Sequence, residues 1–204
     1  PRLLSSAASD VYKRQAETYL PEWVGTGKTE ITIRSILEMR SGLSAGPGGD
    51  ANIYSGGING DQLAFALART SESPPRSQNW SYSNADSMLL AGILEESTGQ
   101  NVLDFADKEL FSKIGMQADW WTDERGHAMT YCCIDSTTRD FARFGLLFAR
   151  NGKWNDEQLI SESWIDVSTR VPSNTNNQGY ALQWWVNQSA CLLYTSPSPR
   201  DAES

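Results

Sequence analysis

The stretch Trp80-Ser81-Tyr82-Ser83-Asn84 combines reactive side chains with a definite structural setting. A loop rich in Pro, Ser and Asn runs here into a segment with the apolar spacing of an amphipathic helix. As a catalytic group, Tyr82 would shuttle a proton, with its phenol pKa lowered by a neighbouring cation, and Asn84 would donate to a substrate carbonyl. As structural residues, Tyr82 would pack under the helix and Asn84 would be its N-cap. The residues alone leave both interpretations open.

Helices separated by Gly-, Ser- and Pro-rich loops are expected to position this stretch. Residues able to cap helix starts stand before segments of helical apolar spacing, at Thr32, Asn59, Ser83 or Asn84, Asn101, Thr137 and Ser161. Gly99 is expected to end the helix that starts near residue 84. Residues 180–186 alternate between large apolar and other side chains, which favours a strand. The predicted fold class is therefore α+β, a mostly helical piece with a returning strand.

Other motifs carry weaker chemical signals. The segment 25–29, Gly-Thr-Gly-Lys-Thr, lacks the first glycine of a phosphate-binding loop, because Glu22 stands there, so a solvated turn is expected. His127 is the only histidine and is not part of an H-E-x-x-H spacing, so it is interpreted as a loop residue near a cleft. Cys132 and Cys133 are interpreted as two small buried side chains rather than as a disulfide or a zinc site.

The chain contains 8 tryptophans, with one adjacent pair at 120–121 and another at 184–185. At least one ring of each pair is expected to face the core, and a role in lining a substrate cleft stays open.

Composition excludes several classes of partner. The net charge of −8 argues against binding of nucleic acid or an anionic membrane, because the sequence-independent part of such binding needs clustered Lys and Arg. No apolar run approaches the length of about 18 residues expected of a transmembrane helix. No metal or cofactor motif is complete, so none of either is predicted.

The two ends do not resemble protein sequence. Residues 10–15 can be encoded by GATGTGTATAAGAGACAG, and the reverse complement of that string, read one base out of frame, encodes residues 191–196 apart from its last base. We therefore predict that residues 1–15 and 191–204 are translated sequencing-adapter scars and that 16–190 is part of one domain. This interpretation leaves localisation open, because it provides no native N-terminus.

Several segments, in order along the chain, carry a family resemblance. They are residues 32–43, which end in Ser-Gly-Leu; 80–84 with the helix behind them to 99; 111–116; 136–145; and 152–165. Together they resemble the serine β-lactamase-like family, which includes class C β-lactamases, penicillin-binding DD-peptidases, related esterases and nylon-oligomer hydrolases. The residues at 39–43 and 138–145 are most similar to those of the nylon-oligomer hydrolase and esterase branch.

The resemblance implies a three-layer β-lactamase/transpeptidase-like fold and acyl transfer on a small-molecule amide, ester or lactam. Family members use the serine of a Ser-x-x-Lys box as nucleophile, and a Lys/His-Ser/Thr-Gly box lies on a strand edge that completes the oxyanion hole. At the matched positions, Tyr82 would pass the proton to the leaving group and Asn84 would orient the substrate amide.

This sequence departs from the family pattern at two boxes. None of its lysines has a serine three residues before it, and no Lys-Thr-Gly or His-x-Gly follows residues 180–186. We therefore expect an internal fragment of a serine hydrolase that is inactive by itself. The alternative is a non-catalytic domain of the same fold that binds or senses peptidoglycan-like peptides; recovering a Ser-x-x-Lys box upstream would exclude it.

Overall fold

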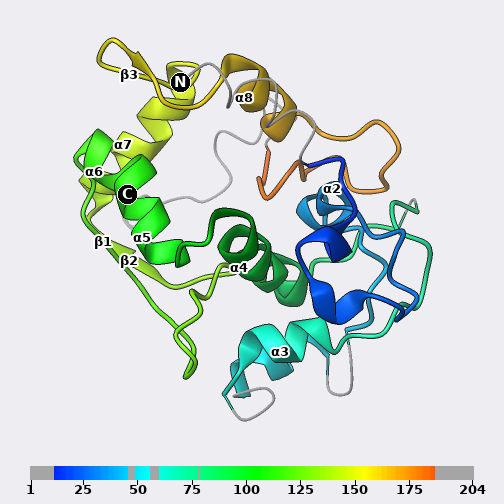
Figure 1. The fold of residues 1–204 in the computed structure, drawn as a ribbon. Helices are drawn as coiled ribbons and strands as arrows, with labels where there is room; N and C mark the ends of the chain where they lie inside the picture. Colours follow the sequence, from blue (N-terminus) through cyan, green and yellow to red (C-terminus); the bar gives the residue numbers. More distant parts are fainter. Residues whose placement is uncertain (1–11, 46–48, 56–59, 78, 187–204) are drawn as a thin grey trace, which may run out of the picture.

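A computed structural model describes residues 12–45, 49–55, 60–77 and 79–186 (Figure 1). Its helices are η1 Ala16–Thr18, η2 Pro21–Trp23, α2 Ile33–Leu37, η3 Asp50–Ser55, α3 Gln62–Leu67, α4 Asn84–Thr98, α5 Val102–Ala106, the π-helical η4 Asp107–Phe111, α6 Ser112–Ile114, α7 Thr138–Ala149 and α8 Glu162–Thr169. Its strands are β1 Ala118–Trp120, β2 Ile134–Ser136, β3 Lys153–Trp154 and β4 Glu157–Gln158. Helices with two small hairpins give the α+β content predicted from the sequence.

The longest helix, α4, lies at the centre, between α2 and α3 on one side and α5 to α7 on the other (Figure 1). Ser83 caps it by accepting a hydrogen bond of 3.0 Å from the backbone nitrogen of Asp86. Gly99 ends it with a φ of 65°, a left-handed conformation that costs glycine little. Both boundaries agree with the prediction.

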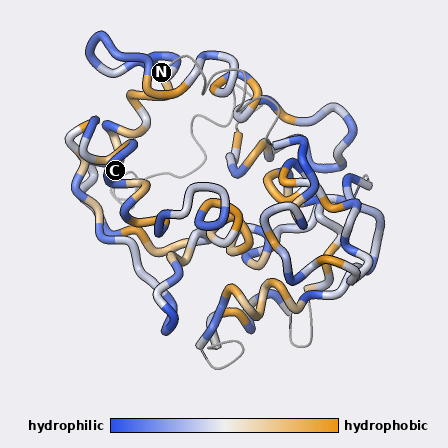
Figure 2. The backbone as a smooth tube through the Cα atoms, viewed as in Figure 1, coloured by the Kyte–Doolittle hydropathy of each residue, from blue (hydrophilic) through white to orange (hydrophobic). Residues whose placement is uncertain are grey.

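The two largest of three hydrophobic clusters among the described residues hold most of the helices together, and Figure 2 shows hydrophobic stretches along α3 and α4. The larger cluster joins the N-terminal segment to α2, α3 and α4 and includes the fully buried Trp23, Ile36, Met88 and Leu89. The smaller cluster packs α6 against α7 through Phe111, Ile114, Met116 and Leu147. Burial of these apolar faces is the main stabilising term for short helices, which are marginal on their own.

The helix caps mostly lie where the sequence places them. Thr32, Asn101, Thr137 and Ser161 each accept a hydrogen bond from the first turn of the next helix. The prediction of Asn59 as a cap is wrong, because Asp61 caps α3 by accepting from the backbone nitrogen of Ala64 at 2.8 Å. Asn59 itself lies outside the described residues.

The strands differ from the prediction. β1 pairs with β2 and β3 with β4, both antiparallel, and neither hairpin is predicted from the sequence. The strand expected over 180–186 is reduced to one antiparallel bridge, between Tyr180 and Trp185. The backbone turns at Gln183, which has a φ of 61° and donates its backbone N–H to the carbonyl of Leu37 at 3.0 Å. This contact with the end of α2 replaces continued strand pairing.

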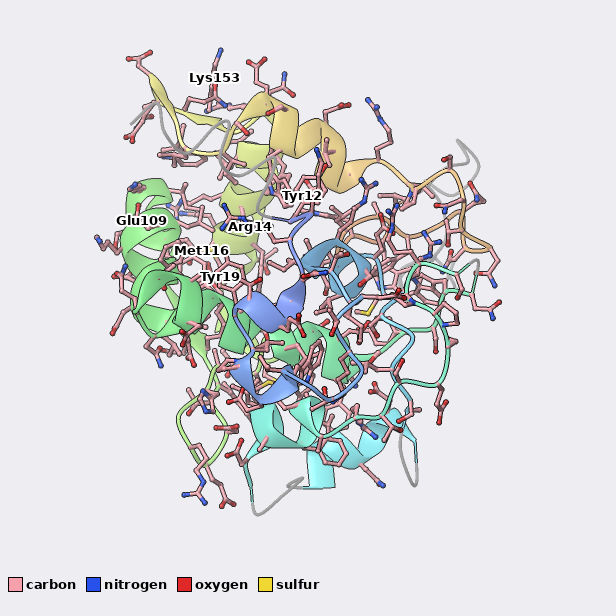
Figure 3. The ribbon with its side chains drawn as sticks, turned by 45° about the vertical axis from the view of Figure 1, so that its right-hand side comes forward. Tyr12, Arg14, Tyr19, Glu109, Met116 and Lys153 are labelled. Carbon is pink, nitrogen blue, oxygen red and sulfur yellow. A yellow bond between two sulfur atoms is a disulfide. The ribbon has the colours of Figure 1, made fainter. Side chains whose placement is uncertain are left out.

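The N-terminal described segment runs alongside α2. Figure 3 labels Tyr12, Arg14 and Tyr19 in this segment, and the guanidinium of Arg14 donates to the Tyr19 hydroxyl at 3.0 Å. The Tyr12 ring packs 5.6 Å from that of Trp164 in α8. Most of the two predicted adapter segments lies outside the described residues, and their origin stays a prediction. Among the described helices, none is long and apolar enough to cross a membrane.

Candidate active site

Tyr82 lies just before α4 in a cluster of aromatic rings. Its ring stacks on Trp185 at a centroid distance of 6.0 Å and meets Tyr180 edge-on at 6.5 Å. Trp80 packs 5.7 Å from Trp185 on the same cluster. Tyr82 is 44% exposed and Trp185 is 65% exposed, so these two rings offer an apolar surface to solvent. The interpretation of Tyr82 as a structural residue requires its ring to pack beneath the helix. The ring does not pack there.

The surroundings of Tyr82 raise the pKa of its phenol, mainly through burial and then through the nearby Tyr54 and Asp50. The expectation of a pKa lowered by a neighbouring cation is therefore wrong for the described residues. Burial disfavours the phenolate, and the negative charge of Asp50 disfavours it further. Among these surroundings, Tyr82 holds its proton at neutral pH.

Asn84 is the first residue of α4 rather than its cap, because Ser83 takes that position. Its side-chain Nδ2 donates to the Tyr54 hydroxyl at 3.0 Å, and its backbone nitrogen donates to a carboxylate oxygen of Asp50 at 2.6 Å. The other Asp50 oxygen accepts from the backbone nitrogen of Ala85 at 3.4 Å. Asp50 thus stabilises the positive end of the α4 dipole and fixes the position of Asn84 at the start of the helix.

A buried carboxyl lies directly behind this site. Asp86 is 1% exposed, and its Oδ1 accepts from the Ser41 hydroxyl at 2.7 Å. Burial raises the Asp86 pKa to about 7, although the Ser41 hydrogen bonds favour the charged form. Ser41 precedes Gly42 in the Ser-Gly-Leu turn, so this contact joins that turn to the first turn of α4.

Two residues of this site, Asp50 and Tyr54, are not identified from the sequence, whereas a cleft-lining role for Trp185 is left open there. Tyr54 joins the two predicted residues, since it bonds Asn84 and raises the pKa of Tyr82. Tyr54 is itself 58% exposed and lies edge-on to Tyr131 at 5.3 Å. A Gly-rich loop gives no periodic signal, so only the presence of an acid and a phenol within it could have drawn attention.

Of the weaker motifs, the segment 25–29 departs from the expected solvated turn at Lys28, whereas His127 lies where the sequence predicts. Lys28 is buried, donates to the Leu67 carbonyl at 2.6 Å and lies 4.9 Å from the Trp23 ring centroid, so it does not face a phosphate. Burial lowers the Lys28 pKa. His127 lies in a loop that lines a cavity, as predicted, and its Nδ1 donates to Glu95 Oε2 at 2.9 Å.

The interpretation of the cysteines is wrong in this structure. Cys132 and Cys133 are half-buried and joined by a disulfide, in a turn where Cys133 has a φ of 73°. The described residues contain no group of His, Cys, Asp and Glu able to hold a metal ion.

In each tryptophan pair one ring packs against other residues and the other is exposed, as the sequence predicts. Trp120 donates its indole N–H to the Met129 and Cys132 carbonyls, both at 3.0 Å, and Trp184 stacks on Phe144 at 5.9 Å. Their neighbours Trp121 and Trp185 are exposed.

Solved structures share this architecture. A protein described as a 6-aminohexanoate-dimer hydrolase from Bacillus anthracis superposes with a TM-score of 0.76 at 24% identity, over 92% of this chain and 55% of that one. A penicillin-binding protein homologue from Caulobacter crescentus gives a TM-score of 0.67 at 14% identity, over 89% and 61%. A D-stereospecific amidohydrolase from a Streptomyces species gives 0.63 at 17% identity, over 92% and 67%. At these identities the likeness shows the fold.

The chain spans little more than half the length of the first of these proteins. No curated protein sequence matches it significantly. A family model described as Beta-lactamase matches residues 9–195, which is most of the chain. The chain belongs to the beta-lactamase family.

Proposed function

We propose that the chain is part of a serine hydrolase that cleaves an amide, ester or lactam bond through an acyl-enzyme. The observation that supports this most is the grouping of Tyr82 and Asn84 around Tyr54, beside exposed aromatic rings, in a chain of the beta-lactamase family. A phenol, an amide donor and an apolar surface together suit an uncharged carbonyl substrate.

In the proposed reaction, a serine from a Ser-x-x-Lys box outside this sequence attacks the substrate carbonyl and becomes acylated. Tyr82 transfers the proton released by that serine to the leaving amine or alkoxide, which departs neutral. Asn84 donates its side-chain N–H to the substrate amide oxygen and orients it. Water then releases the acyl group as a carboxylic acid. Because the 204 residues contain no Ser-x-x-Lys box, we propose that the chain as given does not turn over substrate.

Mass spectrometry of the intact protein tests this proposal. The given chain and the same chain joined to its flanking gene sequence are incubated with p-nitrophenyl butyrate and with a penicillin. We expect a covalent adduct, located on the serine of the restored Ser-x-x-Lys box, only in the longer protein. Reversible peptide binding by the longer protein without any adduct would contradict hydrolysis and favour the non-catalytic alternative.

A further inference from the structure

The disulfide between the adjacent residues Cys132 and Cys133 has no part in the proposed hydrolysis. Both cysteines are half-buried rather than enclosed in the core. A disulfide opens when a thiolate attacks one of its two sulfurs, at a rate that depends on access to that sulfur. The pair is therefore a candidate for reaction with thiols, and the question is what its opening would change in the surrounding structure.

The backbone conformation of Cys133 is linked to this disulfide. The φ of Cys133 is 73°, in the left-handed region that residues with a Cβ disfavour. The sulfur–sulfur bond closes a small ring through the peptide bond between the two cysteines, and ring closure limits the conformations of Cys133. Once the ring is open that limit is gone, and negative φ values become the favourable ones. Opening the disulfide is therefore expected to change the backbone at Cys133.

Three hydrogen bonds attach the two cysteines to neighbouring residues. The Cys133 carbonyl accepts from the backbone nitrogen of Trp121 at 2.9 Å, and the Cys132 carbonyl accepts from the indole N–H of Trp120 at 3.0 Å. The backbone nitrogen of Cys132 donates to the Met129 carbonyl at 3.0 Å. Because peptide units are planar, a change of φ at Cys133 rotates its two flanking carbonyls relative to each other. The turn cannot then keep both carbonyls directed at the two tryptophans.

Tyr131, directly before Cys132, connects this turn to the candidate active site. Its hydroxyl donates to Gln62 Oε1 of α3 at 2.7 Å, and its ring meets the Tyr54 ring edge-on at 5.3 Å. The Tyr54 hydroxyl accepts from the side-chain amide of Asn84 at 3.0 Å. Two contacts thus separate Tyr131 from the Asn84 amide, so a displacement of Tyr131 changes the surroundings of that amide.

We propose that the Cys132–Cys133 disulfide is a site of reversible modification by thiols, and that its opening is transmitted through Tyr131 and Tyr54 to the Asn84 amide. With a dithiol, one thiolate attacks a cysteine sulfur, the sulfur–sulfur bond breaks, and the other cysteine leaves as a thiolate and is protonated. The second thiol of the reagent then attacks the mixed disulfide and releases the first cysteine. The reagent becomes a cyclic disulfide, and its two electrons and two protons end on the two cysteine thiols.

Alkylation of the folded chain tests the modification. Cys191→Ser removes the third cysteine, and the chain is first equilibrated with oxidised dithiothreitol. Mass spectrometry should then find no uptake of iodoacetamide before reduction, and two carbamidomethyl groups on Cys132 and Cys133 after dithiothreitol without denaturant. Circular dichroism should keep its helical signal throughout. Two groups before reduction, no uptake until urea is added, or loss of the helical signal on reduction would each overturn the proposal.

NMR of the side-chain amides tests the transmission. Reduction should shift the Asn84 side-chain amide signals and leave unchanged those of Gln158, whose amide donates to the Asn151 carbonyl in a separate hairpin. Unshifted Asn84 signals in the reduced chain would contradict the transmission.

A matched pair of double variants tests the cause of the change. Cys132→Ala with Cys133→Gly keeps a residue that adopts a left-handed φ freely, so its Asn84 signals should match those of the oxidised chain. Cys132→Ala with Cys133→Ala should match the reduced chain, and identical Asn84 signals in the two variants would overturn the role of Cys133. These measurements use no substrate, so their outcome is independent of whether the parent protein is a hydrolase.

Discussion

The side-chain amide of Asn84 donates a hydrogen bond of 3.0 Å to the hydroxyl of Tyr54, which lies 30 residues earlier in the chain. The same loop holds the backbone of Asn84 through Asp50. Two independent contacts thus fix both the position of this residue and the orientation of its amide. Substrate would compete with Tyr54 for one of the two amide donors and leave the backbone anchor in place.

This arrangement predicts that Asn84→Ala harms binding more than folding. The Asp50 anchor acts on the backbone and remains, so the free energy of unfolding should fall by only about 1 kcal/mol, the usual net value of one hydrogen bond. In the protein with its flanking sequence restored, kcat/KM should fall roughly 10- to 100-fold as a directed donor is lost. Steady-state kinetics and thermal melts measure the two effects.

Asn101→Ala is the matched control for that variant. Asn101 caps α5 by accepting from the backbone nitrogen of Leu103 at 2.8 Å, so its loss should also cost about 1 kcal/mol of stability. It lies away from the Tyr82 cluster, and kcat/KM should not change. Equal loss of activity in both variants would show that Asn84 acts only through stability.

Tyr82→Phe should separate catalysis from packing. The ring and its stacking on Trp185 are kept, so the Tm should stay nearly constant. Loss of a positioned proton donor should lower kcat of the restored protein roughly 10²- to 10⁴-fold. Tyr19→Phe removes a hydroxyl that accepts from Arg14 and should leave kcat unchanged. A Tyr82 variant with a lower Tm and normal kcat would identify Tyr82 as a packing residue.

The sequence predicts the ends of α4 well because caps are local. A hydroxyl at Ser83 reaches a backbone nitrogen three residues on, and Gly99 provides the left-handed residue that ends the helix. The same rule misplaces the start of α3, because Asn59 and Asp61 are both good caps two residues apart and only tertiary contacts choose between them.

The rest of the site depends on contacts between distant segments. Nothing local indicates that Asp50 meets the nitrogen of Asn84, which is 34 residues later. The position of Trp185 depends on Gln183, whose backbone donates to Leu37 and whose side chain accepts from Ser87 at 2.8 Å. These bonds favour a turn over the strand that the alternating pattern predicts, and they bring Trp185 onto Tyr82.

The buried Asp86 should make stability depend on pH. Its folded-state pKa of about 7 lies above the ordinary 3.8, so the folded protein holds this proton more tightly. The resulting contribution to stability is complete below about pH 4 and is lost as the pH rises through 7, by on the order of 4 kcal/mol. Asp86→Asn has no proton to lose, so the difference in unfolding free energy between variant and native chain should grow in favour of the variant from pH 5 to pH 8.

Urea unfolding at both pH values measures that difference, and Asp140→Asn is a control of opposite sign. A hydrogen bond from Thr137 is the largest of the effects that lower the Asp140 pKa, so its stabilisation is present near neutrality and lost as the pH falls through its folded pKa. Asp140→Asn should therefore make the free energy of unfolding depend less on pH on the acid side of neutrality. A difference between Asp86→Asn and the native chain that does not change from pH 5 to pH 8 would show that Asp86 is not protonated in the fold.

The Ser-Gly-Leu turn should tolerate no side chain at Gly42. Its φ of 77° is left-handed, and a Cβ there would overlap the backbone carbonyl of Ser73, which is anchored because Ser73 donates its N–H to the Gly42 carbonyl. Gly99 also has a left-handed φ, of 65°, but a Cβ there would meet nothing within 4 Å. Gly99→Ala therefore measures backbone strain alone, about 1–2 kcal/mol. Gly42→Ala adds a clash with backbone that cannot turn aside, and should destabilise by roughly 2 kcal/mol more. Denaturant unfolding of the two variants side by side gives this difference, and equal losses would mean that the backbone around Ser73 moves freely to admit the methyl group.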